Sequence, residues 1–140
     1  MALFKFTIAV LANEPIQVFN HGKHRRDFTY IDDIVGGVRR VLDQLAAPNP
    51  AWQGSVHWRV YNIGNNQPVE LMDYIAALKS ALGKTALKQL LPLQPGDVPD
   101  TFVDLADLVE QFHYQPSTTV KFGIKRFVAW YVNEFNTSVA

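Results

Sequence analysis

Hydrophobic and polar residues follow each other along this chain with the spacings of helices and short strands, beginning with an apolar helix. Residues 1–12 are apolar except for Lys5 and Thr7, and Pro15 ends the helix because it disfavours helical geometry in the residue before it. A surface helix of a self-contained domain normally has a polar face, which this segment lacks. We therefore expect Met1–Leu11 to be buried on more than one side, against another domain or a second copy of the chain.

A strand, a basic turn and a second extended segment follow this helix. Residues 16–19 alternate between apolar and polar as a strand does, and residues 20–23 form a turn. Residues 26–30 are extended again, with Phe28 and Tyr30 on one face. This order favours a hairpin whose turn carries the basic residues.

Further elements are predicted up to the end of the chain. In order, they are a helix from Asp32 or Asp33 to about Leu45, a loop over 46–57, a strand over 58–63, a helix opened by Pro68 and capped by Gly83, a strand over 87–91, a rigid loop over 92–97, a helix from Asp104 to about Phe112 and a last helix from about Thr119. The first of these helices has its apolar face at Ile34, Val38, Val41, Leu42 and Leu45. Gly36 and Gly37 lie inside it and cost about 1 kcal/mol each relative to alanine, so we expect close packing there.

Composition limits the classes of protein to which the chain can belong. The 140 residues suit one domain, and 48% are hydrophobic, which is enough for one core. Lys plus Arg and Asp plus Glu number 13 each, and the resulting net charge of zero argues against a nucleic-acid or membrane-surface binder. Cysteine is absent, which removes disulfides and cysteine-based zinc sites. No apolar stretch approaches the roughly 18 residues of a membrane-spanning helix, so we expect a soluble, cytoplasmic chain.

The densest positive charge lies in the turn His21–Arg26. Gly22 beside several cations could offer converging donors to a phosphate without a bulky side chain in the way. The alternative is a solvated hairpin turn, which composition alone favours. His21 and His24 are three residues apart with no third ligand nearby, so we do not expect a metal site.

Carboxylates in two places could also carry chemistry. Asp27, Asp32 and Asp33 could form an acid/base or metal cluster, but helix capping explains Asp32 or Asp33, and Asp27 can pair with a neighbouring arginine. We therefore expect no catalytic carboxylate among them. The stiff loop Pro92–Asp97 either receives sugar hydroxyls or only connects a strand to a helix.

Catalytic motifs are missing from the sequence. Neither a glycine-rich dinucleotide fingerprint nor a serine-centred nucleophile elbow occurs. No tyrosine is followed by lysine four positions later, so a Tyr-x-x-x-Lys pair is absent as well. We therefore predict no catalytic, cofactor-binding or metal-binding residue on this chain.

The segment Gly22–Asp33 resembles a known motif. It is similar to the Gly-x-x-x-Arg-Asp-Phe-x-Tyr-x-x-Asp segment of the extended short-chain dehydrogenases that act on nucleotide sugars. Further stretches keep the order of that family, namely Ala2–Thr7, Val60–Gly64, Pro68–Met72, Gln94–Val98 and Phe127–Tyr131. The resemblance covers essentially the whole chain, is closest to the UDP-glucuronate 4-epimerases and corresponds to the C-terminal part of the family.

This resemblance implies a set of substrate-binding residues. The family's diphosphate-binding arginine falls on Arg26, and the residues that contact the nucleobase fall on Gln17 and Phe19. The aspartate near the ribose falls on Asp97. Many members have a second phosphate-binding arginine three positions before this aspartate, where this chain has Gln94, so the second phosphate contact is expected to be lost or supplied otherwise. The neighbouring basic residues would be bystanders, namely Lys23, His24 and Arg25.

The resemblance also implies how the chain is organised. Residues 1–140 would form a small mixed α/β substrate-binding subdomain, the C-terminal nucleotide-sugar-binding domain, without the N-terminal Rossmann domain that holds NAD and the Tyr-x-x-x-Lys pair. The intact enzyme would invert C4 of UDP-glucuronate or a related UDP-sugar, and this chain alone would be inactive. The alternatives are a nucleotide-sugar decarboxylase or dehydratase, a non-catalytic nucleotide-binding module and a fragment that associates with itself.

Overall fold

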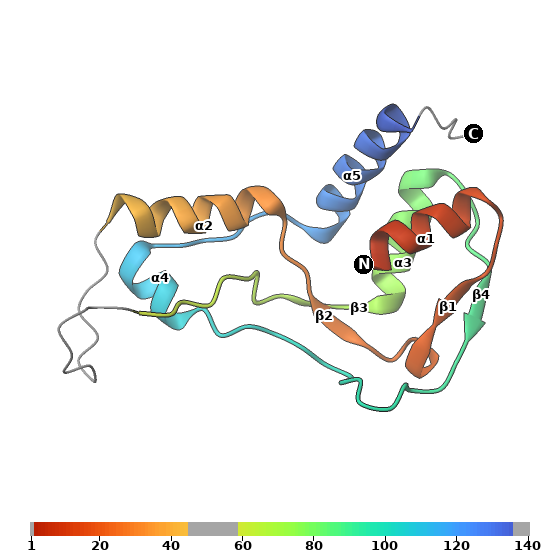
Figure 1. The fold of residues 1–140 in the computed structure, drawn as a ribbon, viewed down its shortest axis with the longest axis horizontal. Coiled ribbons are helices and arrows are strands. Elements are labelled where there is room, and N and C mark those ends of the chain that lie inside the picture. The colour runs from red at the N-terminus through yellow and green to blue at the C-terminus, as the bar shows by residue number, and fades with distance from the viewer. Residues whose placement is uncertain (1, 45–58, 136–140) are drawn as a thin grey trace.

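The computed structural model describes residues 2–44 and 59–135, and within them the chain has a mixed α/β fold (Figure 1). In chain order the elements are α1 (Ala2–Leu11), β1 (Ile16–Val18), the 3-10 turn η1 (Phe19–Gly22), β2 (Arg25–Asp27), α2 (Ile31–Asp43), β3 (Pro68–Glu70), α3 (Leu71–Leu82), β4 (Lys88–Leu90), α4 (Ala106–Phe112) and α5 (Val120–Glu134). The predicted fold class is confirmed. The loop predicted over 46–57 and Trp58 lie outside the described residues.

The described strands pair in two separate two-stranded sheets. β1 runs parallel to β4, with Ile16 opposite Lys88, and β2 runs antiparallel to β3, with Arg26 opposite Val69. The hairpin prediction for the basic turn is therefore wrong, because β1 and β2 take partners far away in the sequence instead of each other.

The second edge of β2 is held by the loop that follows β4. The Arg25 N–H donates to the Pro99 carbonyl at 3.0 Å, and the Thr101 N–H donates to the Arg25 carbonyl at 3.1 Å. β2 thus lies between β3 and residues 99–101. This pairing brings the basic turn next to the loop that contains Asp97.

Pro68 does not open a helix as predicted, because Pro68–Glu70 pair with β2 instead. α3 begins at Leu71, whose N–H donates to the His24 carbonyl at 2.8 Å. The predicted end of α3 is confirmed, since Gly83 has the left-handed geometry (φ 63°) that glycine adopts without strain.

The larger of two apolar cores lies between α1, α3, α5 and β1. Its buried members are Val10, Ile16, Val18, Tyr74, Ile75, Leu78, Leu82, Ala86, Ile124 and Val128. α3 contributes Ile75, Leu78 and Leu82, which lie on one face at helical spacing, and Thr119 caps α5 by accepting from the Phe122 N–H at 3.3 Å. This core fixes β1 and the strand β4 beside it.

α1 is covered on one side and open on another. The Phe4 ring packs edge-on against rings of α5, with centroids 5.2 Å away at Tyr131 and 5.7 Å away at Phe127. Thr7 is buried, and its hydroxyl is satisfied by donating to the Leu3 carbonyl at 2.8 Å, whereas Ile8 is 48% exposed. The expected burial on more than one side is therefore absent at Ile8 within the described part of the chain.

The smaller core joins α2 to α4 and to the segment before β3. Its buried members are Leu105, Leu108, Phe112 and Tyr114, with Val41, Tyr61, Ile63 and Val103 packed against them. A Cβ added at Gly37 would lie 3.1 Å from the Tyr114 ring, so the close packing predicted at this glycine is confirmed. Around Gly36 nothing lies within 4 Å of such an atom, so there the prediction is wrong.

Much of the apolar face of α2 is exposed. Val38 and Leu42, predicted to be buried, are 44% and 79% exposed, because the smaller core covers only the side of Gly37 and Val41. Together with two further exposed residues they form a row along the helix, which we call the α2 stripe: Ile31, Val35, Val38 and Leu42. Leu45 lies outside the described residues.

Residues 59–63 do not form the predicted strand. Their sequence has the β-branched and aromatic residues of a strand, but no strand of the described part of the chain pairs with them. Val60 is 72% exposed, while Ile63 packs against the smaller core. The segment therefore has strand character without a partner.

Candidate functional site

Asp27, the last residue of β2, has a structural role. Its carboxylate accepts backbone N–H bonds from residues 65–67, the shortest of them 2.9 Å long from Asn66. Among the described ion pairs none includes Asp27, so the predicted pairing with a neighbouring arginine is wrong. Asp27 instead fixes the turn that leads into β3.

Asp33 also ties segments together. The N-cap of α2 is Tyr30, which makes no side-chain cap, so the predicted aspartate cap is wrong. The Asp33 carboxylate accepts from the backbone N–H groups of Ser117 and Thr118 at 3.3 and 3.1 Å, just before α5. Because backbone bonds occupy this carboxylate, we assign it no catalytic role.

The glycine of the basic turn is required by the backbone. Gly22 has φ 81°, and a Cβ there would lie 2.7 Å from the Met72 sulfur. Asn20 and His21 also have positive φ, and the Asn20 side-chain amide donates to the Lys23 carbonyl at 2.6 Å. The turn is thus held by its own contacts, and Gly22 faces Met72.

Arg26 emerges from β2 into the loop that follows β4. One terminal nitrogen, Nη1, donates to the carbonyls of Arg25 and Pro99 at 3.0 and 2.6 Å. The other, Nη2, donates to the Val98 carbonyl at 2.7 Å and to Asp97 Oδ1 at 3.1 Å. The guanidinium therefore joins two segments more than 70 residues apart in the sequence, and Asp97 balances its charge.

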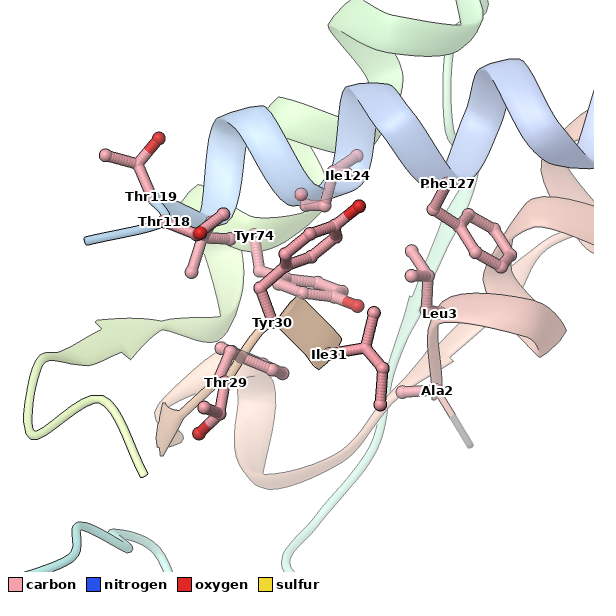
Figure 2. A pocket seen from close by; sticks show the side chains of 13 residues that line it. Ala2, Leu3, Thr29, Tyr30, Ile31, Tyr74, Thr118, Thr119, Ile124 and Phe127 are labelled. Atoms are coloured by element: carbon pink, nitrogen blue, oxygen red, sulfur yellow. The ribbon is translucent and has the colours of Figure 1, made fainter. Parts of the chain in front are cut away.

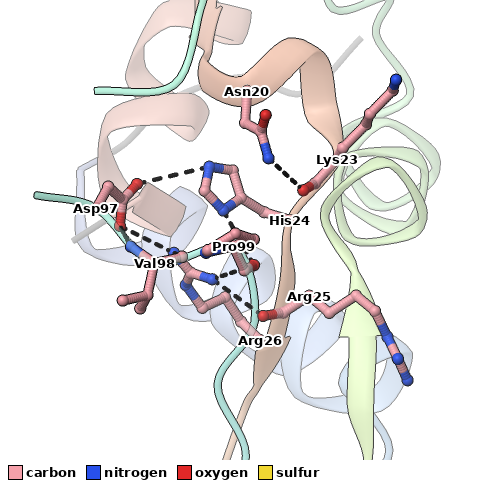
Figure 3. Close-up of polar contacts among 8 residues, drawn as sticks. All are labelled: Asn20, Lys23, His24, Arg25, Arg26, Asp97, Val98 and Pro99. Atoms are coloured by element: carbon pink, nitrogen blue, oxygen red, sulfur yellow. Dashed lines mark hydrogen bonds and ion pairs between the residues drawn. The ribbon is translucent and has the colours of Figure 1, made fainter. Parts of the chain in front are cut away.

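Asp97 is the point at which the cluster converges (Figure 3). Its Oδ1 accepts from Arg26 and from the Val98 N–H, the latter at 2.9 Å, and its Oδ2 lies 3.5 Å from His24 Nε2. A turn in which the Asp97 N–H donates to the Gln94 carbonyl at 3.1 Å sets the position of the carboxylate. The structure thus brings Arg26, Asp97 and Gln94 into one neighbourhood.

His24 is the residue that sequence reasoning missed. It was expected to be a bystander, yet it is only 4% exposed and its Nδ1 lies 3.1 Å from the Pro99 carbonyl. A histidine inside a basic run gives no sequence signal of burial. Only the pairing of β2 with residues 99–101 encloses its ring.

The other two predicted binding residues line a separate cavity of about 450 Å³, which we call the α1–β1 cavity. Its walls are Ala2, Lys5, Phe6, Ala9, Pro15, Ile16, Gln17 and Phe19. The cavity combines an aromatic ring at Phe19 with an amide at Gln17 that can both donate and accept hydrogen bonds. A flat, polar-edged ring would find both stacking and hydrogen-bonding groups there.

A further cavity of about 480 Å³ lies beside the start of α5, and the rings of Tyr30 and Tyr74 line it (Figure 2). Tyr74 stacks on Phe28 with ring centroids 4.2 Å apart, and burial raises the pKa of the Tyr74 hydroxyl far above its ordinary value. Most of the remaining wall is apolar, and Thr29 and Thr118 add hydroxyls. None of the predicted binding residues lines this cavity.

Within residues 2–44 and 59–135, no group of three His, Cys, Asp or Glu side chains could hold a metal ion. No helix in the same ranges is long and apolar enough to cross a membrane. The arrangement at Arg26 and Asp97 offers cationic donors and a carboxylate acceptor, and the α1–β1 cavity offers stacking. Such groups bind and orient a polar ligand.

The chain is similar to known proteins in sequence and structure. Residues 1–64 match the sequence profile of the NAD dependent epimerase/dehydratase family. The chain is 44% identical to Protein CapI of Staphylococcus aureus over 96% of its own length and 43% of the relative's. It is 42% identical to a probable UDP-glucuronate 4-epimerase of Rhizobium meliloti (strain 1021), over 94% of this chain and 41% of the relative.

A solved structure shares both the fold and part of the sequence. The UDP-glucuronic acid 4-epimerase of Bacillus cereus, crystallised with UDP-glucuronic acid and NAD, is 27% identical and superimposes with a TM-score of 0.80. The match covers 96% of this chain and 40% of the Bacillus protein, so this chain spans about two fifths of the length of the proteins it matches. Over nearly its whole length the chain is therefore similar to one part of proteins named as nucleotide-sugar epimerases, and its residues 1–64 match the NAD dependent epimerase/dehydratase family.

Proposed function

We propose that residues 1–140 act as the nucleotide-sugar-binding domain, the C-terminal part, of an NAD-dependent epimerase that inverts C4 of UDP-glucuronate or a related UDP-sugar. The observation that carries the proposal is the contact between Arg26 and Asp97, at 3.1 Å. It joins the two motifs that resemble substrate-binding segments of the family. The similarity to a probable UDP-glucuronate 4-epimerase supports the choice of substrate class.

The predicted binding residues lie in two places, and each place would contact a different part of the ligand. Arg26 would bind the diphosphate, because a guanidinium offers two parallel donors to phosphate oxygens. Gln17 and Phe19 would hold the nucleobase in the α1–β1 cavity, and Asp97 would accept a ribose hydroxyl. Gln94 carries no charge, so it would contribute at most a neutral hydrogen bond where many relatives have a second arginine.

Binding would rearrange the Arg26 contacts. All four hydrogens on the Arg26 terminal nitrogens already have acceptors in Arg25, Asp97, Val98 and Pro99. A phosphate oxygen can therefore reach them only by displacing an acceptor, and the Asp97 side chain is the one that can move without shifting backbone. We expect Asp97 to exchange Arg26 for the ribose when the ligand binds.

The intact protein would contain a dinucleotide-binding domain beside this chain. NAD bound there would supply hydride transfer at the sugar C4, and none of these 140 residues carries the glycine-rich fingerprint, so no residue of this chain is proposed to hold it. This chain would bind the nucleotide and orient the sugar. On its own it would be inactive.

The α2 stripe and the unpaired segment 59–63 would be the docking surface for that domain. Leu42 and Val60 are 79% and 72% exposed, and an apolar row of this kind normally lies against another surface. Because no strand of the described ranges pairs with segment 59–63, it could extend a sheet of the neighbouring domain. Self-association through Met1–Leu11 is the competing use of exposed apolar surface, with Ile8 as its candidate contact.

Nuclear magnetic resonance of the chain alone tests the binding assignment, because it detects millimolar affinities. Titration with UDP-glucose should shift signals of Phe19, Arg26 and Asp97. Arg26→Ala should weaken binding by roughly 10-fold to 100-fold, since a hydrogen bond to a charged group contributes about 1.5–3 kcal/mol. Arg25→Ala is the matched control, because Arg25 is exposed and paired with Glu70 at 3.4 Å.

Three outcomes decide between the candidate functions. Equal binding by the Arg26→Ala and wild-type chains contradicts the diphosphate assignment, provided that thermal melting shows both to be folded. Micromolar binding by the chain alone favours a self-sufficient nucleotide-binding module. Weak binding that tightens when the dinucleotide-binding part of a relative is fused to the chain supports the epimerase domain.

A further inference from the structure

We propose that His24 is a positioning residue whose protonated ring holds Asp97 and gives the Arg26 cluster the net positive charge that a sugar diphosphate needs. The inference rests on the proposed function, because it concerns the same ligand. It adds a residue that the family motif does not assign, since the resemblance at this segment is carried by Gly22 and Arg26 to Asp33.

Both nitrogens of the His24 ring face acceptors. Nδ1 lies 3.1 Å from the Pro99 carbonyl, and Nε2 lies 3.5 Å from Asp97 Oδ2. A neutral imidazole has one N–H and one lone pair, so in either tautomer one nitrogen would point a lone pair at an oxygen. Only the imidazolium, with two N–H groups, fits both neighbours.

Because the His24 ring is buried, it matters whether the ring is neutral or protonated. His24 is 4% exposed, and its Nε2 is a buried nitrogen that makes no hydrogen bond among the described residues, although Asp97 Oδ2 lies 3.5 Å away. Water therefore does not reach this nitrogen to satisfy it. A small movement of Asp97 towards the ring would convert the 3.5 Å contact into a charged hydrogen bond.

The charges around the ring determine the effect on an anion. With His24 protonated, two cations, His24 and Arg26, face one carboxylate, Asp97, and the cluster carries one net positive charge. With His24 neutral, Asp97 cancels Arg26 and the cluster carries none. The other charged neighbours on the packed segments are Lys23, Arg25, Glu70 and Asp100, and of these Arg25 and Glu70 form a pair of their own.

Protonated His24 also gives Asp97 a second partner. When a phosphate oxygen takes the Arg26 donors, Asp97 loses one cation and retains the other. When His24 is neutral, the same exchange leaves a partly buried carboxylate with uncharged donors, namely the Val98 N–H and the ribose hydroxyl. Affinity for a sugar diphosphate should therefore fall as the pH rises and His24 loses its proton.

The test measures UDP-glucose affinity between about pH 5 and 8, the range in which histidine changes charge. Both phosphates of UDP-glucose are esterified, so the ligand keeps its charge across this range. For the wild-type chain we expect the affinity for UDP-glucose to fall on the order of tenfold from the acidic to the alkaline end. This is the effect of one charged hydrogen bond, reduced because solvent screens the charges. His24→Gln should remove this dependence, and His21→Gln, which changes an exposed histidine of the same turn, should retain it.

Nitrogen-15 spectra of the ligand-free chain provide an independent readout. At the acidic end His24 should show two protonated ring nitrogens. An equal pH dependence of affinity in the wild-type and His24→Gln chains would overturn the role of His24. No binding of UDP-glucose by the wild-type chain at any pH would instead contradict the proposed function itself.

Discussion

The two apolar cores of this chain differ in how completely they are covered. In the larger core, α1, α3, α5 and β1 bury one another's side chains, and Leu82 and Val18 have no exposed surface at all. In the smaller core, α2 and α4 bury four residues between them and leave the α2 stripe open. The two groups lie at opposite ends of the molecule, joined by β2, β3 and the loop after β4 (Figure 1).

The difference lies in how the exposed apolar residues are arranged. Around the larger core they are separate side chains such as Ile8 and Trp130, whereas beside the smaller core they form a row along one helix, an arrangement typical of an interface. The cluster of His24, Arg26 and Asp97 lies on the strand and loop that connect the two ends. We therefore expect the ends to respond differently to the same kind of change.

Truncation of a buried leucine should show the largest difference. Leu82→Ala should lower the free energy of unfolding by about 3–5 kcal/mol, because the closed core cannot relax around the cavity. Leu108→Ala in the smaller core should cost about 2–3 kcal/mol, at the lower end for buried leucines, since a more open core can collapse into the gap. Urea denaturation followed by circular dichroism measures both. Equal losses, or a larger loss at Leu108, would mean that the smaller core is as rigid as the larger one.

Each core contains a buried tyrosine that should destabilise the protein at high pH. Burial raises the pKa of Tyr74, and burial followed by the charges of Asp33 and Asp27 raises the pKa of Tyr114. Since both folded values lie above the unfolded value of about 10, the stability is complete below pH 10 and is lost as the pH rises through the folded values.

The loss should approach about 1.4 kcal/mol per pH unit for Tyr74, and unfolding measured at several pH values above 10 checks it. Tyr74→Phe should flatten the pH dependence of the free energy of unfolding more than Tyr114→Phe, because the pKa shift of Tyr74 is the larger one. Tyr114→Phe also removes a hydrogen bond of 3.0 Å to the Gly64 carbonyl, so its effect at neutral pH is the control for packing. If Tyr114→Phe flattened the pH dependence of stability more than Tyr74→Phe, the larger pKa shift would not belong to Tyr74.

Two adjacent glycines in α2 probe the boundary between its covered and open sides. Gly36→Ala should stabilise the chain by about 0.5–1 kcal/mol, because alanine favours the helix and an added Cβ meets open space. Gly37→Ala should gain nothing or lose stability, since its Cβ would lie 3.1 Å from the Tyr114 ring. Thermal melting compares the pair, and equal gains would show that Tyr114 can move aside.

The sequence predicted the elements of the larger core better than those of the smaller one. α3 follows helical spacing closely, because its partners lie within this chain and select those positions. The predicted strand is absent at residues 59–63, and Val38 and Leu42, predicted to be buried, are exposed among the described residues. Hydrophobic spacing indicates that a face seeks burial but does not identify the surface that buries it.

For the candidate site, the motif located Arg26 and Asp97 but could not reveal how they are held. Their contact depends on β2 pairing with residues 99–101, a long-range pairing that no local pattern encodes. The same pairing buries His24, which looked like one more solvated cation in a basic run. The division of the site between the α1–β1 cavity and the Arg26 cluster likewise became visible only in three dimensions.

The smallest effect on this chain, and the sharpest test of the α2 stripe, should come from Leu42→Ser. Leu42 is 79% exposed, so the substitution should change the free energy of unfolding of the chain alone by less than about 0.5 kcal/mol. When the chain is fused to the dinucleotide-binding part of a relative, burial of Leu42 in the interface should raise that loss to about 1.5–3 kcal/mol. Lys88→Ser, an exposed change on β4 in the other half of the molecule, is the control and should be neutral in both proteins. If Leu42→Ser is as harmless in the fused protein as in the chain alone, the stripe is ordinary surface and the docking proposal is wrong.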